Sequence, residues 1–108
     1  KNSTMLIQYN TDNNIKGSQE KSEQFEQIIN EQLKRFSEQI SRIEVYINDE
    51  NSHKAGQDDI RCTLEARLDG QSPVAVTHYA GDQSLALKGA LTKLKSMLET
   101  ITGKMRNY

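Results

Sequence analysis

The sequence predicts an α+β domain with the element order β-α-β-β-β-α, a two-layer sandwich in which two helices cover one face of a four-stranded mixed sheet. Two periodicities carry this prediction. Apolar residues alternate with polar ones in four short segments, as in half-buried strands, and recur every three or four residues in two longer segments, as in amphipathic helices. The third observation is the Asp69-Gly70 pair between two alternating segments, which is typical of a tight hairpin turn.

The first strand and the first helix are expected before residue 41. Met5, Ile7 and Tyr9 form one side of a short strand, and the turn-forming residues 11–14 end it. Ser18 is the expected N-cap of the helix, because a serine side chain accepts a hydrogen bond from an N–H group of the first turn. One buried helical stripe is predicted along the apolar residues Phe25, Ile28, Ile29, Leu33, Phe36 and Ile40.

Three further strands are expected between residues 42 and 80. The second runs through Ile43, Val45 and Ile47, a polar loop follows at 49–58, the third covers 60–68 and the fourth covers 74–80. A strand–helix–strand start requires a parallel first pair joined by a right-handed crossover, and the two later links make an antiparallel meander. The side chains expected on the open face are Arg42, Tyr46, Arg61, Thr63 and Arg67, with Glu44 and Glu65 as ion-pair partners across the strands.

Gly81-Asp82 opens the last helix, which carries most of the clustered positive charge. Its apolar seam is Leu87, Leu91, Leu94, Leu98, Ile101 and Met105. About 100° of rotation per residue places Lys88, Lys95 and Arg106 on one flank of this seam and Lys93 and Lys104 on the other. Residues 83–108 hold five basic side chains against one acid, a net charge of +4, whereas the other 82 residues sum to −5.

Length and composition predict one domain over residues 1–108, with residues 1–4 as a possible leader or tag remnant. The longest apolar runs fall far short of the roughly 20 residues that cross a bilayer, so we expect no membrane partner. Cys62 is the single cysteine, which excludes an intrachain disulfide and favours a reducing cytoplasm. A monomer is expected.

The residue types needed for catalysis or metal binding are too few and too scattered. His53, Cys62 and His78 do not make the four close ligands of a zinc site, and the six glycines form no phosphate-binding loop. Spacing alone leaves a Cys62–His78 nucleophile–base pair open, but such a pair needs an exposed thiolate and Cys62 belongs to the inward set of its strand. His78 is expected to end a strand. We therefore expect no enzyme activity, cofactor, metal or small-molecule substrate.

The chain resembles the ribosome hibernation-promoting factor, or ribosomal subunit interface protein, family in its short form. The matching pieces are Asn10-Thr11-Asp12-Asn13-Asn14-Ile15, Leu33-Lys34-Arg35-Phe36, Ile43-Glu44-Val45, Arg61-Cys62-Thr63-Leu64-Glu65-Ala66-Arg67-Leu68, Ala80-Gly81-Asp82 and Gly89-Ala90-Leu91-Thr92-Lys93-Leu94-Lys95. The resemblance implies a fold similar to double-stranded-RNA-binding domains. It also implies binding to small-subunit rRNA in the mRNA/tRNA channel, where such proteins silence or store ribosomes under stress.

The residues expected to contact rRNA are Lys34, Arg35, Lys88, Lys93, Lys95, Lys104 and Arg106. Their alternative role is structural. Long basic side chains cover the edges of an apolar seam, and Lys34 and Arg35, in the last turns of the first helix, suit the negative end of its dipole.

The sequence departs from the family in its charge. The first helix carries the acids Glu20, Glu23, Glu26, Glu31 and Glu38, and the last helix ends in Glu99-Thr100-Ile101-Thr102-Gly103-Lys104 where family members usually carry lysine-rich stretches. We therefore expect a weaker grip on RNA than the family pattern implies. The alternative function is a divergent protein–protein interaction module on the same fold, using the acidic helix or the open sheet face.

Overall fold

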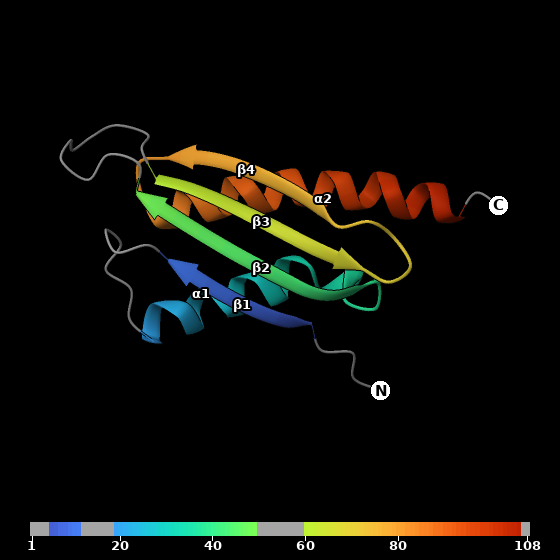
Figure 1. Ribbon diagram of the computed structural model, residues 1–108, viewed down its shortest axis with the longest axis horizontal. Helices are drawn as coiled ribbons and strands as arrows, with labels where there is room; N and C mark the ends of the chain where they lie inside the picture. The colour runs from blue at the N-terminus through green and yellow to red at the C-terminus, as the bar shows by residue number, and fades with distance from the viewer. Residues whose placement is uncertain (1–4, 12–18, 50–59, 107–108) are drawn as a thin grey trace.

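The computed structural model describes residues 5–11, 19–49 and 60–106, and its elements follow the predicted order (Figure 1). They are β1 (Leu6–Thr11), α1 (Gln19–Gln32), the 3₁₀ helix η1 (Lys34–Phe36), β2 (Ile40–Asp49), β3 (Ile60–Leu68), β4 (Val74–Ala80) and α2 (Gln83–Arg106). The predicted turn after β1, the Ser18 cap and the loop after β2 lie outside the described residues, apart from their edges. The α+β fold class is confirmed.

The four strands form one mixed sheet in the order β1-β2-β3-β4 (Figure 1). β1 pairs with β2 in parallel, whereas β2 with β3 and β3 with β4 are antiparallel. Gly70 has a φ of +72°, a conformation that glycine adopts without steric cost, in the turn that joins β3 to β4. The predicted parallel pair, meander and Asp-Gly turn are therefore correct.

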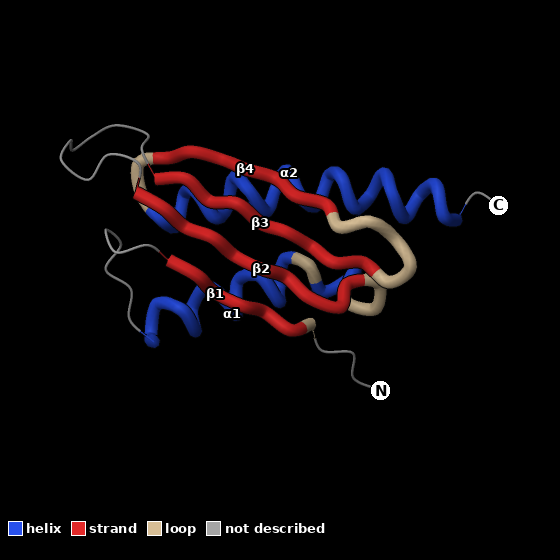
Figure 2. Tube along the Cα trace, viewed as in Figure 1, coloured by secondary structure: helices blue, strands red, loops and turns tan. Residues whose placement is uncertain are grey.

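Both helices lie behind the same face of the sheet, α1 behind β1 and β2 and α2 behind β3 and β4 (Figures 1 and 2). The core between the layers is apolar, and every buried residue described is hydrophobic. Its largest fully buried side chains are Phe25, Ile29, Leu33, Ile43, Ile47, Leu64, Leu87, Leu91, Leu94 and Leu98. These residues belong to the predicted stripes of both helices and to the inward sets of the strands.

The first helix is shorter than its apolar spacing predicts. α1 ends at Gln32, Leu33 leaves the helical conformation with φ −108° and ψ 15°, and η1 follows. Phe36 is buried from η1, and Ile40 is buried as the first residue of β2. The spacing of buried residues thus continues through three backbone conformations, because it reports burial on the core side rather than helix continuity.

Asp82 caps α2 at the position where the sequence places the start of the last helix. Its Oδ1 accepts a hydrogen bond from the backbone N–H of Leu85 at 2.8 Å, and its carbonyl oxygen accepts one from the N–H of Ala86 at 3.0 Å. An N-cap carboxylate satisfies a free N–H group of the first turn and opposes the positive end of the helix dipole.

α2 crosses β4 so closely that a side chain at Gly89 would meet the His78 ring. A Cβ atom on Gly89 would lie 2.1 Å from Cδ2 and 2.5 Å from Cγ of His78. Contrary to the prediction, His78 does not end its strand, because β4 continues to Ala80. It lies within β4, opposite Cys62 of β3, on the face that the helices cover.

Gly89→Ala is expected to destabilise the protein by up to about 2 kcal/mol in urea unfolding. Overpacking costs about 1–3 kcal/mol, and the better helix propensity of alanine returns about 1 kcal/mol of it. In a His78→Ala background the clash is absent, so the same substitution should be neutral or stabilising. An equal loss in both backgrounds would show that the imidazole ring does not impose the glycine.

Candidate nucleic-acid interface

A shallow groove runs between α1 and α2 and carries basic side chains from the second helix. It encloses about 220 Å³ and is lined by Ile28, Gln32, Lys88, Leu91 and Thr92. Its floor is apolar because Ile28 and Leu91 belong to the stripes that face the core. We call this feature the interhelical groove.

Lys88 and Lys95 lie on the groove side of α2. The two residues are seven positions apart, close to two helical turns, so they project from the same flank of the apolar seam. Nζ of Lys95 donates a hydrogen bond to Oε1 of Gln32 at 2.8 Å, which ties this flank to the end of α1. Lys88 is exposed and lines the groove. The predicted placement of these two lysines on one flank is correct.

η1 supplies two further cations, which follow the end of α1 in the chain. Lys34 and Arg35 are exposed, while their neighbours Leu33 and Phe36 are buried and hold the turn against the core. This alternation fixes the two cations outward. They lie in the 3₁₀ turn and not, as the sequence suggested, in the last turns of the first helix.

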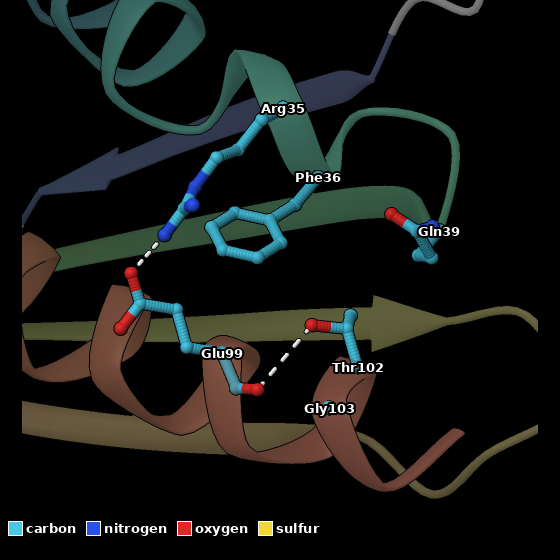
Figure 3. A pocket seen from close by; sticks show the side chains of 6 residues that line it. All are labelled: Arg35, Phe36, Gln39, Glu99, Thr102 and Gly103. Atoms are coloured by element: carbon cyan, nitrogen blue, oxygen red, sulfur yellow. Dashed lines mark hydrogen bonds and ion pairs between the residues drawn. The ribbon is translucent and has the colours of Figure 1, made fainter. Parts of the chain in front are cut away.

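Arg35 joins η1 to the C-terminal half of α2 (Figure 3). Its guanidinium lies 4.7 Å from the centre of the Phe36 ring and forms an ion pair with the Glu99 carboxylate. This contact borders a cavity of about 260 Å³, which Gln39 and the end of α2 complete. Arg35 therefore contacts α2 as well as its own turn.

The Arg35–Glu99 pair is weak as a source of stability because both side chains are more than half exposed, at 61% and 55%. Exposed ion pairs contribute about 0–1 kcal/mol. A phosphate group can therefore replace Glu99 at Arg35 at little cost. Glu99 itself lowers the positive potential of this surface.

The structure separates Lys93 from the other predicted contacts. Its Nζ donates a hydrogen bond to the carbonyl oxygen of Thr77 in β4 at 2.7 Å, on the opposite flank of α2. The side chains of Lys104 and Arg106 lie outside the described part of the chain. Lys88 and Lys95 lie at the groove, while Lys34 and Arg35 are exposed on η1. We call these four residues the groove cations.

Sequence reasoning missed the contacts of two polar residues, Gln32 and Glu99, with two of the groove cations. Gln32 accepts the bond from Lys95, 63 positions away, and Glu99 pairs with Arg35, 64 positions away. No local pattern links residues so distant in sequence. The three- and four-residue spacing predicts which face of each helix is buried. It does not predict the position of one helix along the axis of the other.

The described residues contain no cluster typical of a metal centre, and the Cys62 thiol, opposite His78 in the strand register, is buried. They include no group of three or more His, Cys, Asp or Glu side chains that could hold a metal ion. Cys62 is fully buried, and this burial raises the pKa of its thiol to about 12. None of the described helices is both long and apolar enough to span a membrane.

The architecture defines a class of small α+β domains in which a parallel strand pair opens a four-stranded sheet and two helices cover one face. No protein-family profile matches the chain, and no curated protein sequence matches it.

Solved structures show the same fold. A ribosomal subunit interface protein from Coxiella burnetii superposes with a TM-score of 0.68 at 17% identity, covering 92% of this chain and 99% of that one. The N-terminal domain of Thermus thermophilus Protein Y gives a TM-score of 0.65 at 17% identity, with coverages of 90% and 99%. The fold that the sequence resemblance implied is therefore confirmed over nearly the whole chain.

Proposed function

We propose that this protein is a non-enzymatic ribosome-associated factor that binds small-subunit rRNA in the mRNA/tRNA channel and silences or protects ribosomes by occupying it. The observation that carries the proposal is the near full-length match of its fold to a ribosomal subunit interface protein. A cytoplasmic location follows from this partner. The mechanism is steric, since a folded domain in the channel excludes other ligands.

The groove cations supply the chemistry for holding RNA. Lys34, Arg35 and Lys88 are exposed, and Lys95 is partly buried with its Nζ at the groove edge. Cations that neutralise phosphates release condensed counterions, so the affinity falls steeply as salt rises. Lys88 and Lys95 lie two helical turns apart at the groove, where they can contact separate phosphates.

Lys88→Glu is expected to weaken binding to purified small ribosomal subunits by about tenfold or more in co-sedimentation. The substitution removes a charged hydrogen bond worth about 1.5–3 kcal/mol and adds repulsion. Lys93→Glu is the matched control, because it makes the same charge change on the same helix but on the flank that faces β4. It should cost clearly less.

Two further results bear on the proposal. Glu99→Gln should strengthen binding, because it removes the acid that pairs with Arg35. Retention of wild-type protein in the supernatant at low salt, with no sedimentation alongside the subunits, would overturn ribosome association.

One observation favours the second candidate, a protein–protein module. α1 carries the acids Glu23, Glu26 and Glu31 against Lys21 among its described side chains, a sign unsuited to phosphate. The same variants separate the two functions. A partner that is recovered equally by wild-type protein and by Lys88→Glu would support the module and not the RNA contact.

A further inference from the structure

The helices leave one face of the sheet uncovered (Figure 1). Two exposed tyrosines lie on this open face, since they alternate along their strands with residues that face the helices. Tyr46 of β2 is 38% exposed and Tyr79 of β4 is 48% exposed. In the strand register Tyr46 lies opposite Thr63, and Tyr79 lies opposite Arg61, both of β3. β3 therefore lies between the two tyrosines, which are offset by two residues along the strands, and their Cα atoms are about 12 Å apart.

The Tyr46 ring is held in one orientation. Its hydroxyl donates a hydrogen bond to Glu44, two residues earlier on the same strand and the same face. This hydrogen bond is the main cause that raises the pKa of Tyr46, with burial and the negative charge of Glu44 adding to it.

Glu44 does not repel an anion as strongly as its charge suggests. Arg42 forms an ion pair with it at 2.8 Å, along β2 rather than across strands as the sequence predicted. Among the remaining charges of this face, Arg61 and Arg67 outnumber Glu65. The balance of the open face is therefore slightly positive and centred on β3.

Polar groups occupy the surface between the two tyrosines. Nη2 of Arg61 donates to Oδ1 of Asn48 at 3.2 Å, and the hydroxyls of Thr63 and Thr77 are 3.0 Å apart. The rings are thus isolated from each other, and together they do not make the continuous apolar patch that docks a protein. Each ring offers an area that suits one flat aromatic ligand.

We propose that the open face binds a short unpaired segment of RNA, with one base stacked on Tyr79, a second on Tyr46, and the backbone passing Arg61. Aromatic rings interspersed with cations are the arrangement by which sheets hold single-stranded nucleic acid without sequence readout. The choice of RNA rests on the proposed function. The surface lies on the opposite side of the domain from the interhelical groove, so the protein would hold RNA on two sides.

The test measures binding of two end-labelled oligonucleotides by fluorescence anisotropy. One is an oligoadenylate of about eight nucleotides, within the site size of sheet-based binders, and the other is an abasic phosphodiester of equal length and charge. Wild-type protein should bind the oligoadenylate more tightly than the abasic strand. Tyr79→Leu should weaken oligoadenylate binding by about 5- to 150-fold, from the usual 1–3 kcal/mol per stacked base, and leave abasic binding unchanged.

Tyr79→Phe is the matched control, because it keeps the ring and removes only the hydroxyl, and it should bind as wild type does. Tyr46→Leu gives a second, independent variant with the same expected direction. Equal affinity for the two strands, or an unchanged affinity in both leucine variants, would overturn the proposal.

The outcome is separable from that of the proposed function. Lys88→Glu should retain the preference for the oligoadenylate over the abasic strand, since that preference comes from the open face. Co-sedimentation with ribosomes in the absence of this preference would leave ribosome association standing and refute the stacking surface. A preference for the oligoadenylate without co-sedimentation would support the stacking surface and refute ribosome association.

Discussion

In the folded protein, Cys62 is expected to react with a maleimide at pH 8 about a thousandfold more slowly than in the urea-unfolded chain. The reactive species is the thiolate. Burial raises the pKa of this thiol from an ordinary value of 9.0 to about 12, and three pKa units lower the thiolate population about a thousandfold. The side chain is also 0% exposed, so the reagent cannot reach it without an opening of the core. Labelling within about tenfold of the unfolded rate would contradict this burial.

The same shift predicts how stability depends on pH. Below pH 9 the thiol is protonated in both states, and its contribution to the free energy of unfolding is complete. Between pH 9 and about 12 the unfolded chain loses the proton while the folded protein keeps it, so the free energy of unfolding falls by up to about 4 kcal/mol.

Cys62→Ala isolates this contribution. The variant removes the buried thiol but keeps Tyr9, whose pKa is raised mainly by burial and which titrates in the same range. The difference in stability between wild type and Cys62→Ala should therefore change across pH 9 to 12 in favour of the variant. A difference that stays constant over this range would refute the linkage.

Phe25→Ala is expected to lower the free energy of unfolding by about 3–5 kcal/mol, a large share of the 5–15 kcal/mol typical of a domain. Phe25 is 1% exposed and is the buried residue of α1 nearest its start. Its ring meets Tyr9 of β1 edge to face, with the centroids 5.8 Å apart and the planes at 84°. The Tyr9 hydroxyl in turn donates to Oε1 of Gln83 at 3.2 Å, at the start of α2. Urea unfolding measures the loss.

Two variants on α1 serve as controls for this prediction. Phe25→Leu keeps most of the buried volume and should cost clearly less than the alanine. Gln27→Ala changes an exposed position of the same helix and should stay within about 0.5 kcal/mol of wild type. If Phe25→Ala unfolded at the urea concentration of Gln27→Ala, the ring would not anchor α1.

The sequence predicts strands better than it predicts the end of the first helix. The observed bounds of β3 and β4 match the predicted ones, because the apolar–polar alternation stops where the turn residues 69–73 begin and resumes after them. Leu33, Phe36 and Ile40 instead keep a helical spacing after the helix has ended. Burial requires only that a side chain reach the core, and more than one backbone conformation achieves this.

For the candidate site, the sequence predicts which flank of the last helix each lysine lies on, but not which residues it contacts. The helical angle placed Lys88 and Lys95 apart from Lys93, and the structure has them so. The neighbours that these lysines and Arg35 meet depend on how α1 and η1 settle against α2. That arrangement follows from core volume, which a periodicity does not contain.

The hydrogen bond from Lys93 to Thr77 has a consequence for self-association. β4 is an edge strand of the sheet, and an edge strand with free backbone groups invites a strand from another molecule to add to it. Lys93 occupies one of these carbonyl oxygens and places a charge along the edge, which disfavours growth of the sheet across molecules. The flank of α2 that carries Lys93 thus disfavours edge-to-edge aggregation, while the other flank faces the interhelical groove.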